Sequence, residues 1–384
     1  MQDYLDNHLR SFVLDDFGPL EHCVWEPDAD QAGAGWHVII GDNGSGKTSV
    51  LKALSLALLS AQAPASLRVP VDRFVRHGAR SARVSLETAQ GKRRWSTARM
   101  PKSAAPGYHA AFGSNRRFVG DTETARLGSS DPAAARHASL FDPDWSLGDL
   151  VGWLKDLQID HPGPGGPLDG IQRFVNQDGL LPGLELEGVD SKGPRFVDAA
   201  GAPQRMGSLS DGYQSVLGLT LELLRQLHRD FGHVPFRDEE GAVSVDVAGV
   251  VLVDEIDAHL HPSWQQRIGF FFTEHFPRMQ FLVTSHSPLV CRAAEHGSIF
   301  RLPALGSDHQ PGMVSDEARD RLIYGDVLDA YGTEVFGERI TRGRAGQAKF
   351  DRLAELNVKA RFATLEEGEQ GERQRLQQLL VSES

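Results

Sequence analysis

The stretch GDNGSGKT, residues 41–48, decides how this chain folds, and it fits the pattern G-x-x-x-x-G-K-[S/T]. The apolar run WHVII, residues 36–40, precedes it, and a Leu- and Ala-rich run without Gly or Pro, residues 48–59, follows it. This order predicts a buried strand, a glycine-rich turn and a helix. Glycines let consecutive backbone N–H groups face inward, and the start of the helix adds partial positive charge. The stretch therefore predicts a loop that binds phosphate groups.

The side chains of this loop suit a nucleoside triphosphate. Lys47 can reach the β- and γ-phosphates, which also makes it a candidate catalytic residue, and the Thr48 hydroxyl can ligate Mg²⁺. An ordinary glycine-rich turn is the alternative, and the flanking strand and helix argue against it. We therefore predict ATP and Mg²⁺ as the cofactors. The residues predicted to contact the nucleotide here are Asn43, Gly44, Ser45, Gly46, Lys47, Thr48 and Ser49.

An acidic pair follows a second apolar run, VVLVDE at residues 250–255. A strand that ends here would place Asp254 beside the phosphate loop, where its carboxylate can hold Mg²⁺ through water. Glu255 can then polarise the water that attacks the γ-phosphate. Two surface acids after a strand are the alternative, which the phosphate loop disfavours.

A third motif, LSDGYQ at residues 209–214, precedes a long apolar-periodic stretch that predicts a helix from about Ser208 to Phe231. Ser210 could simply cap that helix. The same geometry also offers a second helix N-terminus with a free hydroxyl and a glycine, Gly212, which suits a γ-phosphate. The sequence leaves both interpretations open.

This motif resembles the ABC-type signature LSGGQ, with Asp211 in place of the first glycine and Tyr213 inserted before Gln214. The LSDG variant is typical of the RecF, SMC and OLD-like branch. In that family the signature of one subunit caps ATP that the other subunit holds. The resemblance therefore implies an ATP-driven homodimer in which Ser210 and Gly212 complete the site of the partner.

Two further segments resemble the same family. FLVTSHSP, residues 281–288, looks like the switch-histidine segment, which implies a catalytic His286 near the γ-phosphate; a capping or core histidine is the alternative. DAHLHP, residues 257–262, looks like the DEIDxHLHP form of soluble ABC ATPases in bacterial defence and repair. Its two histidines suggest zinc, but no Cys or carboxylate constellation supports a zinc site. No clear counterpart of the family's Q-loop glutamine lies between the phosphate loop and the signature, and Gln158 and Gln172 are the candidates.

The fold class expected from these motifs is α/β, because strands alternate with helices. The resemblance implies an ABC-type P-loop ATPase head with a mixed sheet core and an inserted helical lobe. No heptad pattern is sustained, so no coiled-coil arms are expected. The predicted segments are residues 1–120 and 249–310 for the two parts of the ATPase lobe, 121–248 for the helical lobe with the signature, and 311–384 for a C-terminal helical region.

Local patterns give more detailed expectations. A hairpin is predicted over residues 83–97, and loops with one short helix over 101–145. Single helices are predicted over 263–276 and 288–295, and two charged amphipathic helices over 349–380. Segments 109–120 and 139–154 resemble the standalone ATPases of antiphage systems such as the Septu and retron-associated group.

Charge is unevenly distributed along the chain. Residues 66–117 hold twelve Lys or Arg residues and two acids, which leaves +10 there and −22 on the rest of a chain whose net charge is −12. Such asymmetry predicts a nucleic-acid partner for this segment, or else a solvated sheet edge. The chain has two cysteines and no long apolar run, so we expect a cytoplasmic protein without disulfides or membrane contact.

We therefore predict an ATP-binding and ATP-hydrolysing ABC-type ATPase that dimerises around ATP and controls a partner effector in antiphage defence or DNA maintenance. No nuclease motif is found, so an effector such as a nuclease would be a separate protein. One alternative is an ATP-gated assembly scaffold without nucleic acid, which would dock a partner on the C-terminal amphipathic helices; those helices could instead pack on the protein itself. A transporter nucleotide-binding subunit is a further alternative, disfavoured by the LSDG variant.

Overall fold

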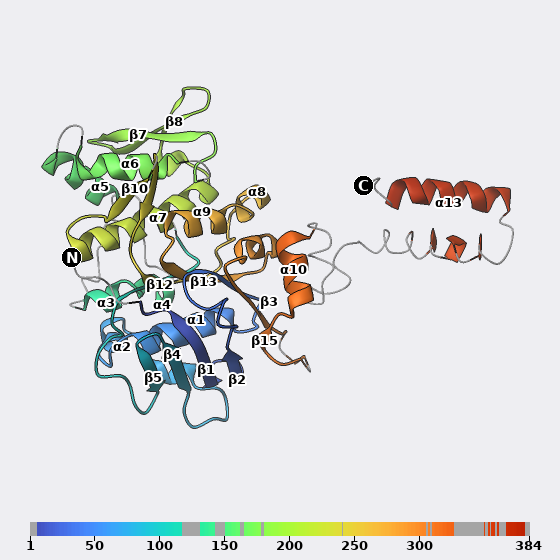
Figure 1. Ribbon diagram of the computed structural model, residues 1–384, viewed down its shortest axis with the longest axis horizontal. Coiled ribbons are helices and arrows are strands. Elements are labelled where there is room, and N and C mark those ends of the chain that lie inside the picture. Colours follow the sequence, from blue (N-terminus) through green and yellow to red (C-terminus); the bar gives the residue numbers. More distant parts are fainter. Residues whose placement is uncertain are drawn as a thin grey trace. The chain divides into compact units, whose positions relative to one another are not determined.

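The protein is described by a computed structural model, which covers residues 6–116, 131–142, 150–161, 165–177, 180–239, 241–304, 306–307, 309–325, 349, 352–353, 355–357, 359–360 and 366–380. The chain divides into two units, Met1–Gly325 and Asp326–Ser384. Each unit is described by itself, and the motifs identified above all lie in the first (Figure 1).

A six-stranded sheet forms the centre of the first unit, in the order β15-β14-β3-β13-β12-β6. All neighbours run parallel except β15, which pairs antiparallel with β14. Val253 of β12 lies opposite Val283 and Phe112, so the carboxyl ends of these strands are level with one another. The strands are β3 (Gly35–Gly41), β6 (Tyr108–Phe112), β12 (Gly249–Val253), β13 (Met279–Ser285), β14 (Gly297–Leu302) and β15 (Gly312–Met313).

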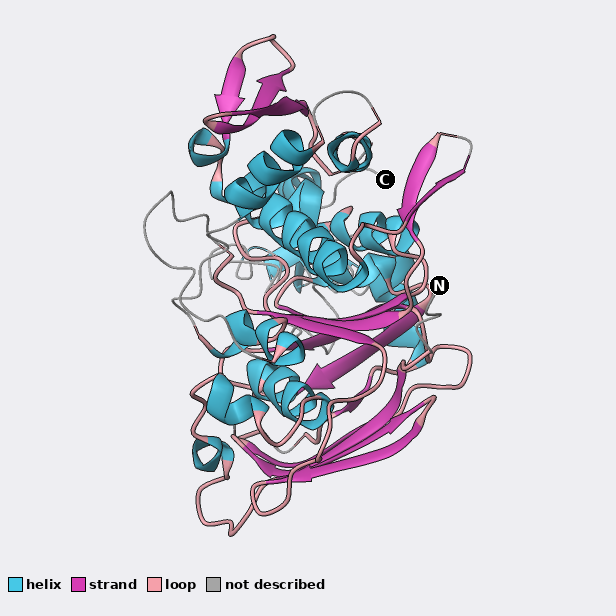
Figure 2. Ribbon diagram, turned by 90° about the vertical axis from the view of Figure 1, so that its left-hand side faces the viewer, coloured by secondary structure: helices cyan, strands magenta, loops and turns pink. Residues whose placement is uncertain are grey.

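A second, antiparallel sheet has the order β2-β1-β4-β5, and α1 (Lys47–Leu58) lies between the two sheets. Figure 2 shows the antiparallel sheet, this helix and the six-stranded sheet as successive layers. Because both sides of α1 are covered, it is apolar nearly all round, and Leu51, Leu54 and Leu58 are fully buried. The strands of the second sheet are β1 (Leu9–Phe17), β2 (Leu20–Trp25), β4 (Arg83–Thr88) and β5 (Gly91–Ser96).

Helices α7 (Asp211–Phe231) and α9 (Ile268–His275) cover the other face of the six-stranded sheet (Figures 1 and 2). The Trp36 ring of β3 stacks on Phe272 of α9 with centroids 6.3 Å apart. The Tyr108 hydroxyl of β6 donates to Gln226 of α7 at 3.1 Å. The remaining helices of this unit are α2 (Ala63–Ser66), η1 (Val71–Phe74), α3 (Pro132–Ala135), α4 (Ala138–Phe141), α5 (Leu150–Asp160), α6 (Pro167–Val175), η2 (Met206–Ser208), α8 (Pro262–Gln265), η3 (Pro288–Ala293) and α10 (Asp316–Tyr324).

The segment predicted as a helical lobe, residues 121–248, holds more β-structure than that prediction implies. Besides α5, α6 and α7, it contains a three-stranded sheet of order β7-β8-β9 and a two-stranded hairpin. These strands are β7 (Leu184–Asp190), β8 (Gly193–Asp198), β9 (Pro203–Arg205), β10 (Phe236–Glu239) and β11 (Ala242–Val245). The domain boundaries at 120, 248 and 310 stay predictions, as does the absence of coiled-coil arms.

Several local expectations are confirmed and others are wrong. The strand over residues 36–40, the strand that precedes Asp254, the helix after the phosphate loop and the hairpin over 83–97 are present. Residues 101–145 are not only loops with one helix, because they include the buried strand β6 and the two short helices α3 and α4.

The helices predicted over 263–276 and 288–295 are also different. The first is divided into α8 and α9, because Trp264 of α8 packs on Tyr213 while Phe272 of α9 packs on Trp36 of the sheet. These targets lie on different elements, so one straight helix does not serve both. The second is the 3₁₀ helix η3.

The second unit contains α13 (Glu367–Leu380) and a preceding helical segment described at residues 352–353, 355–357 and 359–360. Ion pairs Arg352–Glu372 and Lys359–Glu369 join them, and Leu353 and Leu356 are buried. These leucines are therefore unavailable as an exposed docking surface. Within the part of the chain that the structure describes, no helix is both long and apolar enough to cross a membrane.

The layered core makes a direct stability prediction. Replacing Leu54 by Ala removes a fully buried side chain between two sheets that cannot close around the gap. We expect the free energy of unfolding to fall by about 2–5 kcal/mol in urea titrations. Lys52→Ala on the same helix, at a half-buried position, is the control and should change it by under about 1 kcal/mol. Equal losses in the two variants would contradict this layered packing.

Candidate functional site

Four loops converge where the parallel strands of the central sheet end. The phosphate loop leaves β3, the acidic pair leaves β12, His286 leaves β13, and residues 113–116 leave β6. Ser285 pairs with Ile40 and Val253 with Phe112, so these exits are adjacent. The carboxyl edge of a parallel sheet is the usual place for a ligand in α/β proteins.

The phosphate loop curls around the ammonium group of Lys47. Its Nζ donates to the carbonyl oxygens of Gly41 at 2.8 Å and Asp42 at 3.0 Å, and it lies 3.5 Å from Nδ1 of His286. Burial lowers the pKa of Lys47, while Glu255, then Asp254 and other nearby carboxylates, act to raise it. At Gly46 the backbone has φ +101° and a Cβ would meet Pro19 at 3.0 Å, so only glycine fits this turn.

Asp254 connects the phosphate loop to the neighbouring strand. Its carboxylate accepts hydrogen bonds from the hydroxyls of Thr48 at 2.8 Å and Thr284 at 2.7 Å, and it is buried. The backbone N–H of Glu255 donates to the same Thr284 hydroxyl at 2.7 Å. Glu255 has φ +46°, an uncommon backbone conformation for a side chain of this kind. The two residues predicted to hold Mg²⁺ are therefore in direct contact.

Arg116 lies directly beneath the acidic pair. Its guanidinium donates to the backbone carbonyls of Asp254 at 2.7 Å, Glu255 at 2.8 Å and Gly113 at 2.9 Å. The side chain is only 3% exposed, so Arg116 cannot belong to a surface that contacts nucleic acid, as its place in the basic segment suggested. Burial lowers the pKa of Arg116 to about 10, which leaves the group charged at neutral pH.

The sequence did not identify Arg116 as a site residue because β6 was missed. The strand is five residues long and reads YHAAF, with a histidine and two alanines in place of the usual β-branched residues. The signal that could have found it is position: residues that follow a buried parallel strand reach the ligand edge of the sheet. The segment after β6, residues 113–116, contains no glutamine. Gln158 and Gln172 lie instead on α5 and α6, and Gln172 bonds to Glu187 of β7.

The signature residues lie at the start of α7, apart from this cluster. Ser210 occupies the N-cap position but its side chain makes no capping hydrogen bond, and it is exposed. A Cβ at Gly212 would approach the carbonyl of His259 to 2.9 Å, so glycine allows α7 to lie against the loop after Glu255. Among the described residues, no hydrogen bond joins Ser210 to Lys47, Asp254 or Glu255.

The histidine segments take different positions. The backbone N–H of His286 lies 3.4 Å from Asp257, whose other carboxylate oxygen is buried and has no hydrogen-bond partner in the part of the chain that the structure describes. His261 caps α8 by accepting from the Ser263 N–H at 3.3 Å. In the described ranges, no group of three or more His, Cys, Asp or Glu side chains is arranged to hold a metal.

The donors of this edge suit a nucleotide phosphate chain and one divalent cation. The loop offers the Lys47 ammonium, and the Ser45 hydroxyl is buried with no hydrogen-bond partner among the described residues. A hydroxyl and a carboxylate, Thr48 and Asp254, are the hard oxygen ligands that Mg²⁺ takes together with phosphate oxygens. The residues present therefore fit both predicted cofactors.

The bridging hydroxyl of Thr284 gives a test of this geometry. Thr284→Val leaves a carboxylate oxygen of Asp254 and the N–H of Glu255 without their bonds. We expect a loss of about 1–3 kcal/mol in the free energy of unfolding, measured in urea. Thr220→Val is the matched control, because the Thr220 hydroxyl is also buried but has no hydrogen-bond partner within the described ranges. If both valines are equally tolerated, Thr284 does not bridge the two acids.

Comparisons with known proteins agree with this arrangement. Residues 144–292 match the family described as "AAA domain, putative AbiEii toxin, Type IV TA system". The Septu protein PtuA of Bacillus mycoides is 24% identical over 285 residues, 69% of this chain and 36% of that protein. The "Retron Ec83 probable ATPase" of Escherichia coli is 38% identical over 158 residues, 38% of this chain and 28% of that protein.

Among solved structures, the SMC head domain from Thermotoga maritima aligns with 80% of this chain and 98% of its own at a TM-score of 0.42 and 14% identity. The chain spans about a third of the length of the curated relatives it matches. The order of the motifs, their convergence at one sheet edge and the two sequence relatives lead to one conclusion. This chain resembles the Septu protein PtuA and the probable ATPase of a retron, and its motifs stand in the order of ABC-type P-loop ATPases.

Proposed function

We propose that this protein binds ATP with Mg²⁺ at the carboxyl edge of the central sheet and hydrolyses it. The observation that carries the proposal is the continuous contact from Thr48 through Asp254 and Thr284 to Glu255, beside the Lys47 ammonium. A phosphate-binding loop after β3 and two carboxylates after β12 are thereby brought together, with Thr284 of β13 as the bridge between the two acids. These are the parts that phosphoryl transfer to water requires.

In this proposal the loop residues hold the triphosphate. Lys47 gives up its bonds to the Gly41 and Asp42 carbonyls and turns its charge to the β- and γ-phosphates. Thr48 and Asp254 hold Mg²⁺, which neutralises the charge on the phosphate oxygens when bound. The loop residues that line the phosphates are Asn43, Gly44, Ser45, Gly46 and Ser49.

Glu255 acts as the base that orients and deprotonates the attacking water. Its unusual backbone conformation is held at both ends, because Thr284 accepts from its N–H and Arg116 donates to its carbonyl. His286, 3.5 Å from Lys47, is in place to hydrogen-bond the γ-phosphate. The arrangement separates phosphate binding from water activation, so the two steps can be tested separately.

A second copy of the chain completes the site. Ser210 and Gly212 stand at a helix N-terminus, where backbone N–H groups favour an anion. The exposed and uncapped Ser210 hydroxyl supports a partner in trans, because a hydroxyl used only as an N-cap would bond to its own helix. Each signature therefore closes over the triphosphate held by the other subunit.

Glu255→Gln tests hydrolysis and dimerisation together. The amide keeps the size of the side chain but cannot take a proton, so we expect the hydrolysis rate to fall by about 10²–10⁴-fold. ATP should still bind, and the dimer should persist in a light-scattering mass measurement with ATP. Glu185→Gln, an exposed acid on β7, is the control and should behave as wild type. Hydrolysis by Glu255→Gln at the wild-type rate would refute the assigned mechanism.

The similarity to Septu and retron ATPases supports a role in antiphage defence. We propose that the nucleotide state of the dimer controls a separate effector protein, such as a nuclease. The matched relatives are about three times as long as the aligned region. The proposal therefore concerns the aligned region and not the other segments of those relatives.

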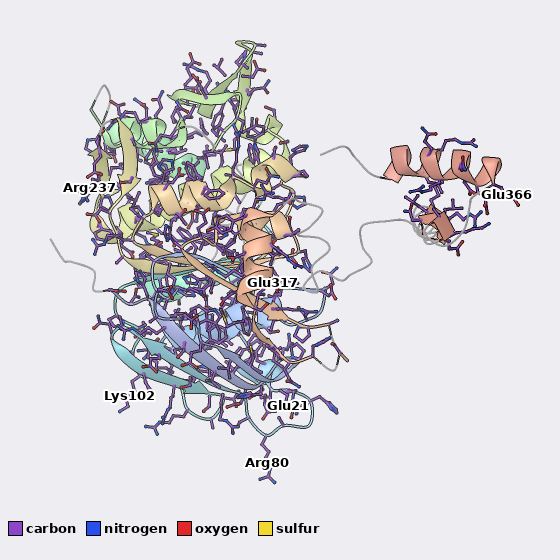
Figure 3. All side chains as sticks on the ribbon, turned by 45° about the vertical axis from the view of Figure 1, so that its right-hand side comes forward. Glu21, Arg80, Lys102, Arg237, Glu317 and Glu366 are labelled. Carbon is purple, nitrogen blue, oxygen red and sulfur yellow. The ribbon has the colours of Figure 1, made fainter. Side chains whose placement is uncertain are left out.

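A nucleic-acid contact is a second part of the proposal, favoured by one surface. Exposed cations on the antiparallel sheet and its adjoining loops, here called the basic face, have no ion pair or side-chain hydrogen bond among the described residues. In Figure 3, Arg80 and Lys102 lie at the end of the unit that carries this sheet, away from Arg237. The basic face consists of Arg68, Arg73, Arg80, Arg94, Arg99 and Lys102.

Charge reversal of this face tests the contact. Reversing Arg80, Arg94, Arg99 and Lys102 to Glu should weaken DNA or RNA binding and reduce its salt dependence by up to about 0.9 in log–log slope per lost phosphate contact. The control reverses four exposed arginines that already pair with acids, so binding should change little. They are Arg173, Arg195, Arg237 and Arg278. Unchanged binding in the first variant, or no binding at low salt with ATP, would reject a role for the basic face.

A further inference from the structure

We propose that Arg116 is a positioning residue for ATP hydrolysis, which holds the backbone of the acidic pair and links it to the signature helix α7. This inference rests on the proposed hydrolysis of ATP at Glu255. It assigns to a buried arginine the connection between the residue that activates water and the helix that faces a second subunit.

The guanidinium of Arg116 donates several hydrogen bonds at once. Arg116 uses Nη1 for the carbonyls of Gly113 and Asp254, Nη2 for Glu255, and Nε for the Ser215 hydroxyl at 3.1 Å. These bonds reach from the end of β6 to the end of β12 and to α7. A planar guanidinium has N–H donors along one edge and at one end, so it can make all of these hydrogen bonds at once. A lysine ammonium has its donors at a single atom and cannot reach the same acceptors together.

The charge of Arg116 is buried, and this burial costs free energy. Among the ion pairs of the described residues, Arg116 has none, so its charge is held by carbonyl oxygens and by the field of more distant acids. A buried charge without a carboxylate in contact is costly unless its donors are all used. A neutral side chain at this position would cost less free energy to bury on folding. The presence of a charged arginine here therefore indicates a role in the site.

The hydrogen bonds of Arg116 hold the backbone of the acidic pair. Glu255 has a left-handed backbone, which a non-glycine residue keeps only when its surroundings enforce it. Thr284 holds its N–H, and Arg116 holds its carbonyl together with that of Asp254. Without Arg116 the peptide that follows Glu255 keeps its bonds to the Thr284 carbonyl and the Ala258 N–H but loses its connection to β6 and α7. The carboxylate of Glu255 is then held less firmly in its direction toward the γ-phosphate.

The hydrogen bond from Arg116 to Ser215 links the acidic pair to α7. Ser215 is buried in the first turns of this helix, five residues after the exposed Ser210. A helix moves as a rigid body over this distance, so a shift of its N-terminus against a partner's nucleotide also shifts Ser215. Arg116 passes that shift to the carbonyl of Glu255, so that water activation depends on closure of the dimer.

Arg116→Lys tests the positioning role, with Arg136→Lys as the matched control. Arg136 is another buried arginine, bonded to the His109 carbonyl and to Asp230 away from the acidic pair. We expect Arg116→Lys to lower kcat by about 10- to 100-fold while KM for ATP stays within about threefold. Arg136→Lys should keep the wild-type kcat. Ser215→Ala, which cuts only the link to α7, should lower kcat by about threefold or more and weaken its dependence on protein concentration.

A double variant separates this role from general loss of structure. If Arg116 acts through Glu255, adding Arg116→Lys to Glu255→Gln should not slow the residual hydrolysis further, whereas independent effects would multiply. If wild type hydrolyses ATP and both Arg116→Lys and Ser215→Ala keep its kcat, the inference is wrong. Should Arg116→Lys not fold, Ser215→Ala decides alone. A wild-type protein without ATPase activity would refute the proposed function instead.

Discussion

The carboxylate of Asp254, which accepts hydrogen bonds from Thr48 and Thr284, is the contact on which the rest of the site depends. Thr48 lies in the first turn of α1, Asp254 directly follows β12 and Thr284 lies near the end of β13, so one buried group joins three elements. A buried carboxylate requires hydrogen-bond donors on its oxygens, and here both oxygens have one. The phosphate loop and the acidic pair are thereby kept at a fixed separation.

The layered packing of the first unit keeps the elements that make this contact in place. Helix α1 lies between the antiparallel and the parallel sheet, and its buried leucines leave it little freedom to slide or turn. The N-terminus of the helix, with the loop that precedes it, is therefore held against the strand ends. On the opposite face of the parallel sheet, α7 and α9 pack through Tyr108 and Trp36. The signature at the start of α7 is positioned by the same sheet that positions the acids.

Much of the site could be predicted because the residues involved are adjacent in sequence to apolar runs of clear length. The loop after WHVII and the acids after VVLV required only the rule that parallel strands present their carboxyl ends at one edge. Arg116 could not be found in this way, since YHAAF lacks the pattern of a strand. Its positive charge suggested a surface contact, and only its burial beneath Asp254 and Glu255 showed otherwise.

The amino-acid sequence by itself determined the phosphate loop, the acidic pair and the helices that follow the phosphate loop and the signature, because local backbone preferences and apolar periodicity are encoded within a few residues. The tertiary structure decided which groups meet: Thr284 with both acids, Arg116 with their carbonyls and with Ser215, and His286 with Lys47. These contacts join residues separated by 29 to 239 positions along the chain. Sequence spacing alone cannot specify them, because they depend on how strands pair and how helices pack across the sheet.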